Sequence, residues 1–297
     1  MFTGLSAFPL TPLRDDAFDE YAYAGLIERL VSAGVDSITA LGSTGSYMYL
    51  DRAERRRVAA SAVQHAGDVP VMVGIGALRT SQAQRLAEDA QEAGARAVLL
   101  APVSYQALTD DDVFGLFEDV TAELSVPLVV YDNPGTTHVT FTDELYARIA
   151  ALPHVASIKI PGVPPAADAA AARVRAIREH VPAAVSIGVS GDPVGATGLN
   201  AGCDIWYSVI AGTLPGPALT ITRAALAGDH AAAAAESDRL TPLWRLFREC
   251  GSFRVTAAIA EHLGLVASDS LPRPVRGLDA DGRARVARIV EELRLAD

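Results

Sequence analysis

The chain has 25 lysine and arginine residues in total, and Lys159 is the only lysine among them. It lies in the apolar segment 155–162, which has the pattern of a buried strand followed by a loop. Arginine can replace lysine as a surface cation, but it cannot act as a nucleophilic amine because its pKa stays above about 12. An arginine-biased composition could also leave one lysine by chance, but such a residue should lie on the surface. Lys159 is therefore a candidate for covalent catalysis.

The segment 42–46 is a second candidate, because its glycines enclose the hydroxyls of Ser43 and Thr44. Glycine lets backbone N–H groups converge on an anion, and the hydroxyls add donors, so the segment suits a carboxylate or a phosphate. An ordinary turn is the alternative, since glycine and serine are common in turns.

Tyr131 ends another apolar run and shares a face with Val129 by the two-residue period of a strand. A phenol at that position can carry a proton, although an aromatic side chain that only packs is the alternative. The same period places Lys159 and Ser157 on one face, and Ile158 on the other.

Short apolar runs alternate with longer stretches of helical period and predict eight strand–helix units. The strands are expected at 5–8, 37–41, 70–74, 97–101, 127–131, 155–160, 184–187 and 204–208. Because no glycine-rich dinucleotide fingerprint follows the first run, a (β/α)8 TIM barrel is favoured over an open doubly wound sheet. We expect the catalytic barrel at residues 1–217 and a C-terminal helical bundle, packed on it, at 218–297.

Barrel enzymes place their chemistry at the carboxyl ends of the strands, so the hydroxyl loop, Tyr131 and Lys159 should meet at one rim. These groups suit Schiff-base catalysis, in which a neutral amine condenses with a ketone and the protonated imine accepts electrons from the adjacent bond. Burial of Lys159 would lower its pKa and supply the neutral amine. The hydroxyl loop would hold the carboxylate of a 2-oxo acid beside that amine.

Composition excludes several other functions. The net charge of −11 and the pI near 5.0 argue against nucleic-acid binding. The two cysteines and six histidines have no metal-ligand spacing, so we expect no metal site. No apolar run is long enough for a membrane span, and residues 1–5 lack the basic region of a signal peptide, which predicts a cytoplasmic protein.

The chain resembles the pyruvate-dependent class I aldolases and lyases that include dihydrodipicolinate synthase and N-acetylneuraminate lyase. The resemblance spans nearly the whole sequence and rests on motifs that occur in order: residues 8–12 (FPLTP), 42–46 (GSTGS), 131–134 (YDNP), 157–159 (SIK) and 188–192 (GVSGD). It implies a TIM barrel, no cofactor, and a homotetramer built as a dimer of dimers.

The resemblance also implies roles for individual residues. Lys159 matches the Schiff-base lysine and Tyr131 the proton-transferring tyrosine, while Ser43 and Thr44 match the positions that bind the pyruvate carboxylate and relay protons. Two substrate-binding positions are carried over as well: Gly188, placed in the loop after the seventh strand, and Tyr207, which borders the keto acid.

The sequence departs from the synthases at three positions. Ser46 replaces a glutamate, and Thr136 replaces the arginine that grips the carboxylate of the aldehyde substrate. Loss of that clamp predicts an aldehyde partner other than that of dihydrodipicolinate synthesis. The tyrosine that synthases contribute across the tight dimer interface falls near residues 103–105, where Tyr105 would serve with a shift of one residue.

The primary interpretation is an aldolase or lyase that acts on pyruvate or a related 2-oxo acid. A dehydratase or hydratase that uses the same imine is one alternative. A catalytically silent protein that binds a small acid is another, and a phosphate-binding isomerase that uses the glycines of 188–191 is a third, although no acid–base pair accompanies those glycines.

We expect Lys159→Arg to fold normally and lose turnover, because the charge persists while the attacking amine is lost. Circular dichroism reports the folding, and release of pyruvate from a panel of aldol products reports the turnover. A variant that remains active would exclude the amine mechanism.

Overall fold

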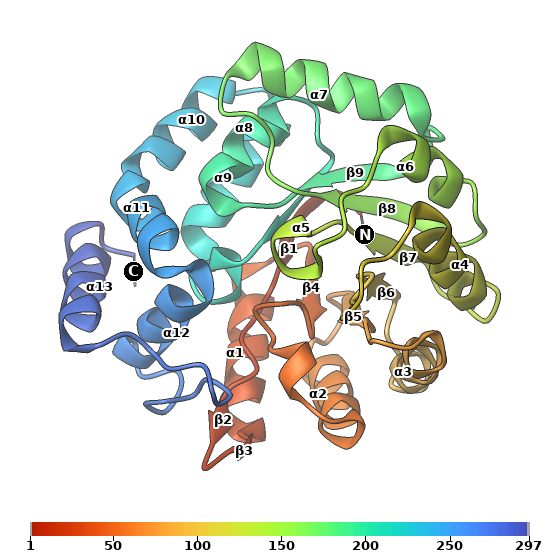
Figure 1. The fold of residues 1–297 in the computed structure, drawn as a ribbon. Coiled ribbons are helices and arrows are strands. Elements are labelled where there is room, and N and C mark those ends of the chain that lie inside the picture. The colour runs from red at the N-terminus through yellow and green to blue at the C-terminus, as the bar shows by residue number, and fades with distance from the viewer. Residues whose placement is uncertain (1, 296–297) are drawn as a thin grey trace.

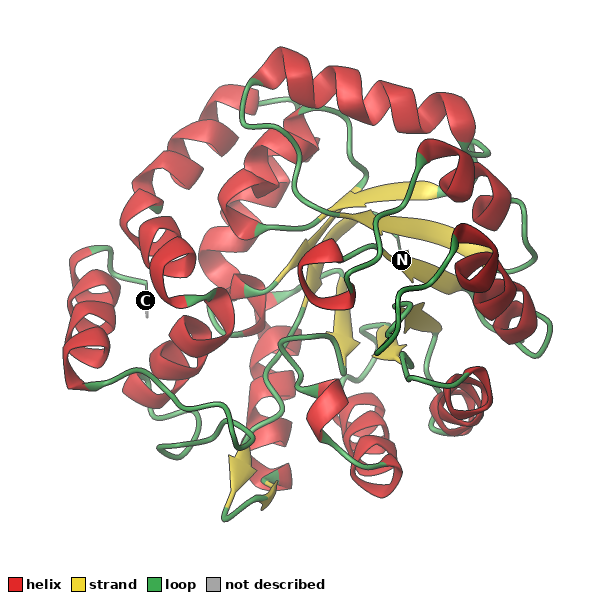
Figure 2. Cartoon of the chain, viewed as in Figure 1, coloured by secondary structure: helices red, strands yellow, loops and turns green. Residues whose placement is uncertain are grey.

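Eight parallel strands close into a barrel, and helices surround it (Figures 1 and 2). The computed structural model describes residues 2–295. Around the barrel the strands follow the order β1-β10-β9-β8-β7-β6-β5-β4. Their bounds are β1 Gly4–Ala7, β4 Ser37–Ala40, β5 Val71–Gly74, β6 Ala97–Leu100, β7 Leu128–Tyr131, β8 Val155–Ile160, β9 Ser186–Val189 and β10 Ile205–Ser208. The predicted TIM barrel is confirmed.

The strands are apolar because both of their faces are buried. Val129 and Tyr131 of β7 point into the barrel, where they pack with Leu99 and Tyr207. Ile158 of β8 belongs instead to the outer core between the barrel and the helices. The two-residue period therefore assigns the inward and outward faces of β7 and β8 as predicted.

The helices cover the outside of the barrel and continue beyond it. Their bounds are α1 Glu20–Ala33, α2 Arg52–His65, α3 Thr80–Glu92, α4 Asp110–Thr121, α5 Pro134–Thr137, α6 Asp143–Ala150, α7 Ala167–His180, α8 Gly195–Asn200, α9 Pro215–Leu226, α10 His230–Arg239, α11 Thr241–Cys250, α12 Ser252–His262 and α13 Ala280–Glu292. Three 3-10 turns, η1 Tyr47–Tyr49, η2 Asp192–Val194 and η3 Ile210–Gly212, follow β4, β9 and β10. None of the helices within 2–295 is long and apolar enough to cross a membrane.

Helices α10 to α13 form the C-terminal part of the fold and lie together on one side of the barrel (Figure 1). The predicted boundary at residue 217 falls inside α9, which packs against β1 and serves as the helix of the eighth strand–helix unit. Helix α11 contacts η2, the turn that follows β9. This contact brings the C-terminal helices to the carboxyl-terminal rim of the barrel.

A short antiparallel hairpin precedes the first helix and was not predicted. It pairs β2 Leu13–Arg14 with β3 Ala17–Phe18. Asp15 and Asp16 form the turn, and both have left-handed backbone conformations, with φ of 53° and 61°. Two-residue strands are too short to give a periodic pattern, so only the turn residues could have signalled them.

Gly188 lies within β9, beside Lys159 of β8 and Ile205 of β10, and not in the loop after the strand as expected. A Cβ atom at this position would lie 2.2 Å from a ring carbon of Tyr207 and 2.5 Å from a methyl group of Ile205. Glycine is required here because the Tyr207 ring fills the space that a side chain would occupy. Its close contact with Tyr207 and Ile205 fits a packing role inside the barrel, and Gly188 is not among the residues that line the cavity.

We expect Gly188→Ala to lower the free energy of unfolding by about 1–3 kcal/mol, because the added methyl group overpacks the barrel interior. Gly216→Ala is the matched control, since nothing lies within 4 Å of a Cβ at that position in α9. Urea denaturation compares the two variants with the parent chain. Equal midpoints for both variants would contradict the packing role.

Candidate active site

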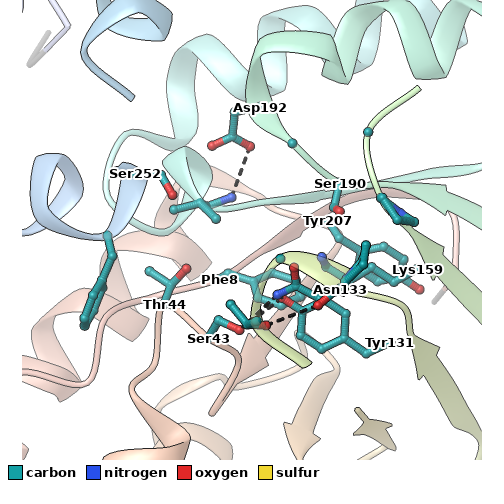
Figure 3. A pocket seen from close by; sticks show the side chains of 18 of the residues that line it. Phe8, Ser43, Thr44, Tyr131, Asn133, Lys159, Ser190, Asp192, Tyr207 and Ser252 are labelled. Atoms are coloured by element: carbon teal, nitrogen blue, oxygen red, sulfur yellow. Dashed lines mark hydrogen bonds between the residues drawn. The ribbon is translucent and has the colours of Figure 1, made fainter. Parts of the chain in front are cut away.

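Lys159 lies near the carboxyl end of β8, and its side chain is only 5% exposed. Its Nζ lies 4.1 Å from the centroid of the Tyr131 ring and 5.5 Å from that of Phe8 (Figure 3). Burial lowers the pKa of the amine from 10.5 to about 7, and the carboxylates of Asp192 and Asp132 partly oppose this shift. Near neutral pH a large fraction of the amine is therefore uncharged and able to attack a carbonyl carbon.

The Tyr131 hydroxyl is held by two neighbours from different segments (Figure 3). It accepts a hydrogen bond from Nδ2 of Asn133 at 2.9 Å and pairs with Oγ of Ser43 at 3.1 Å. Burial raises the pKa of the phenol, and these two hydrogen bonds oppose the rise. Because Asn133 donates to the oxygen, the phenol keeps its own proton available for donation.

The loop that carries Ser43 and Thr44 leaves β4 in a tight turn. Leu41 has a left-handed φ of 57°, and a Cβ at Gly42 would lie 2.5 Å from the Phe8 ring. The loop thus packs closely on the barrel mouth, and glycine at 42 permits that approach. Both hydroxyl residues line the central cavity. Among the described residues, Tyr131 bonds the Ser43 hydroxyl and makes no hydrogen bond with Thr44.

Tyr207 of β10 lines the same cavity from below. Its hydroxyl pairs with Oγ of Ser157 at 2.7 Å, and its ring packs edge-on against Phe8 at 6.0 Å between centroids. Ser157 shares the inward face of β8 with Lys159, as predicted. The Tyr207 hydroxyl is therefore occupied by a barrel residue, while its ring forms the floor beside the lysine.

Two buried carboxylates flank the lysine. Asp192 accepts a hydrogen bond from the backbone amide of Val209 at 3.2 Å (Figure 3), and a second one from that of Ile210 at 2.8 Å. Asp132 accepts one from the Tyr146 hydroxyl at 2.5 Å. Burial raises the pKa of each carboxyl to about 6 despite these bonds. Their negative charge at neutral pH limits how far the pKa of Lys159 falls.

These side chains surround a cavity of about 830 Å³ that opens at the carboxyl-terminal end of the barrel. Five of the six site residues expected from the sequence line it, namely Ser43, Thr44, Tyr131, Lys159 and Tyr207, and Gly188 does not. Sequence reasoning missed several wall residues: Phe8, Tyr47, Asn133 and Asp192, together with Phe247, Arg248, Ser252 and Phe253 from α11 and α12. Phe8, Asn133 and Asp192 lie inside the recognised motifs, whereas the helical residues gave no local signal.

The structure also shows the positions of three further residues: Thr136, His138 and Tyr105. Thr136 and His138 both line the cavity, His138 with a left-handed φ of 59°. Tyr105 is 90% exposed in the loop after β6 and is not part of the cavity wall. Within residues 2–295 no group of three or more His, Cys, Asp or Glu side chains could hold a metal ion.

The fold and the site can now be compared with known proteins. Residues 1–293 match the dihydrodipicolinate synthetase family. This chain belongs to that family. The match confirms the resemblance drawn from the motifs and the expectation of an enzyme of this lyase family.

Individual relatives align with almost the full length of this chain. The 4-hydroxy-tetrahydrodipicolinate synthases of Phenylobacterium zucineum and Halorhodospira halophila are 30% and 32% identical, and each alignment covers 99% of this chain and 98% of the relative. The crystal structure of dihydrodipicolinate synthase from Agrobacterium tumefaciens is 46% identical and superposes with a TM-score of 0.94 over 98% of both chains.

Because Lys159 is the only lysine, labelling lysine with ¹³C at Cε should give a single lysine resonance whose titration reports the pKa of the amine directly. We expect a midpoint near 7, far below the ordinary 10.5, because burial disfavours the ammonium form. NMR titration of the folded protein between pH 5 and 11 measures it, and the urea-unfolded chain is the control. A midpoint above 10 in the folded protein would exclude a buried neutral amine.

Proposed function

We propose that this protein is a lyase that forms an imine between Lys159 and the ketone of pyruvate or a related 2-oxo acid. One observation carries the proposal: the sole lysine is a buried amine with a pKa lowered to about 7, and it faces a phenol inside an open cavity. A surface lysine would stay charged near pH 7 and attack slowly. The names of the synthase relatives fit such an activity.

The proposed reaction starts with the lone pair of the neutral amine, which attacks the ketone carbon. A C–N bond forms, one proton passes from the nitrogen to the former carbonyl oxygen, a second proton is added to that oxygen, and the C–O bond breaks to release water and leave the protonated imine. The Tyr131 phenol would supply the second proton, since Asn133 and Ser43 orient its oxygen. The faces of the Tyr131 and Phe8 rings, near the nitrogen, favour the positive charge that develops there.

The loop with Ser43 and Thr44 would hold the carboxylate of the 2-oxo acid. Both residues line the cavity, and the Ser43 hydroxyl lies within hydrogen-bond distance of the Tyr131 hydroxyl. A carboxylate bound there places the adjacent ketone between the amine and the phenol. Tyr207 would border the bound acid from the barrel floor.

For the second substrate we propose an aldehyde other than the one used in dihydrodipicolinate synthesis. Thr136 lines the cavity at the position where those synthases carry an arginine that grips a carboxylate. A threonine hydroxyl cannot supply the paired, charged hydrogen bonds of a guanidinium. A dehydratase that uses the same imine remains the second candidate, because Tyr131 could equally protonate a leaving hydroxyl.

We further propose that subunits associate through the face formed by the loops after β4, β5 and β6, as the first contact of a tetramer. Large apolar side chains are exposed there: Met48, Tyr49, Leu78 and Tyr105. The loops follow consecutive strands of the barrel, so these side chains belong to one rim. Tyr105 is then placed to reach the cavity of a neighbouring subunit.

The test is reduction with borohydride in the presence of pyruvate, followed by peptide mass spectrometry. We expect one covalent adduct, on Lys159, and no adduct with Lys159→Arg. Tyr131→Phe should form the same adduct at least about 10²-fold more slowly, because the proton donor for water loss is gone.

Ser157→Ala is the control, since its hydroxyl contacts Tyr207 and not Tyr131. If pyruvate gives no adduct with the unmodified chain, the imine mechanism is excluded. An adduct that forms in Tyr131→Phe at the rate of the parent chain would remove Tyr131 from the mechanism.

A further inference from the structure

Arg248, near the end of α11, lines the cavity together with its buried neighbour Phe247. Phe247 belongs to the apolar face of α11, which packs into the core, and Arg248 is exposed at the edge of that face. The contact of α11 with η2 holds this part of the helix at the barrel mouth, next to the turn that contains Asp192. The C-terminal helices thus contribute an arginine to the cavity wall.

Within residues 2–295, Arg248 interacts electrostatically with the neighbouring carboxylate of Glu249 but does not pair with it directly. It has no ion pair or side-chain hydrogen bond there, unlike Arg239 and Arg285 of the same helical region. The adjacent carboxylate, Glu249, is bound by Arg285 at 2.5 Å. The guanidinium of Arg248 therefore keeps its donors available for a group in the cavity.

The other charged groups of the cavity wall do not compete with this cation. Asp192 is buried, and its two oxygens accept from the amides of Val209 and Ile210. Lys159 has a pKa near 7, and the charge of its protonated imine would lie at the ketone carbon of the bound acid and not at the far end of its chain. Arg248 therefore adds a second cationic side chain to the cavity wall, in a chain whose net charge is −11.

Further hydrogen-bonding side chains line the same cavity. Ser252 begins α12 and lines the pocket beside Phe253, and Thr136 and His138 line it from the loop after β7. Together with Arg248 they supply polar groups to the wall of the cavity that contains Lys159. A 2-oxo acid bound at Lys159 would extend its substituent into this cavity.

We propose that Arg248 binds a second acidic group, at the far end of the substrate, so that among 2-oxo acids longer than pyruvate the enzyme prefers those whose chain ends in an anion. This inference rests on the proposed imine function. The synthases carry an anion-binding arginine at the position of Thr136, after β7. In this chain the proposed anion-binding arginine lies on helix α11 instead. A guanidinium pairs with both oxygens of a carboxylate and equally with a phosphoryl group, so the shared chemistry is a terminal oxyanion.

Imine trapping with matched 2-oxo acids tests this without knowledge of the natural substrate. The probes are 2-oxoglutarate against 2-oxopentanoate and 2-oxoadipate against 2-oxohexanoate, pairs of equal carbon number that differ in the terminal carboxylate. The phosphonate 2-oxo-4-phosphonobutanoate distinguishes a phosphoryl end from a carboxylate. The concentration that gives half-maximal borohydride trapping on Lys159 is measured for each probe, with pyruvate as reference.

We expect the parent chain to be half-saturated by a diacid at a concentration at least about tenfold lower than by its matched monoacid. Arg248→Gln should abolish this preference and leave half-saturation by pyruvate within about twofold. Arg245→Gln is the matched control, because Arg245 is exposed on the same helix but does not line the cavity, and it should keep the preference.

The outcomes separate the two proposals. If none of the probes, pyruvate included, gives an adduct, the imine function is wrong and so is this inference. An adduct with pyruvate, but no preference for the acidic chains or a preference that survives in Arg248→Gln, overturns only the role of Arg248. A preference for the phosphonate over both diacids assigns the terminal oxyanion to a phosphoryl group.

Discussion

The site depends on one constraint: the amino group of Lys159 is buried away from water. A buried amine loses its hydration, and without full compensation from nearby carboxylates it releases its proton at lower pH. Here Asp132 and Asp192 lie near enough to Lys159 to oppose this effect, yet their own pKa values rise to about 6 because they too are buried. The balance leaves the amine close to half-protonated at neutral pH, which suits both attack by the free base and later charge on an imine.

The barrel supplies this environment through its closed sheet. The inward side chains of β7, β8 and β10 place Tyr131, Lys159 and Tyr207 around one space, and strand pairing fixes Tyr131 directly opposite Lys159 in register. Such register cannot drift, since a shift of one residue would send every inward side chain to the outer face. Gly188 belongs to the same arrangement, because its missing side chain makes room for the Tyr207 ring. Packing in the barrel thus determines the geometry of the site.

The barrel and the C-terminal helices contribute different residues to the cavity wall, because they lie at different places around it. The barrel strands and their loops hold the groups proposed for bond formation, and the loops lie close to the sheet that positions them. Helices α11 and α12 close part of the mouth and bring Arg248 and Ser252 to the outer wall of the cavity. These wall residues thus lie on elements separate from the strand that holds the lysine.

The sequence alone determined the parts that depend on local pattern. Eight apolar runs predicted eight strands within two residues of their observed bounds, since buried parallel strands have a strong local signal. The single lysine and the motifs around Ser43 and Tyr131 gave most of the barrel site. Only the tertiary structure placed Gly188 inside a strand, paired Tyr131 with Asn133 and Ser43, and brought Arg248 to the cavity. Those relations join residues far apart in the chain or depend on register and packing, which no local pattern encodes.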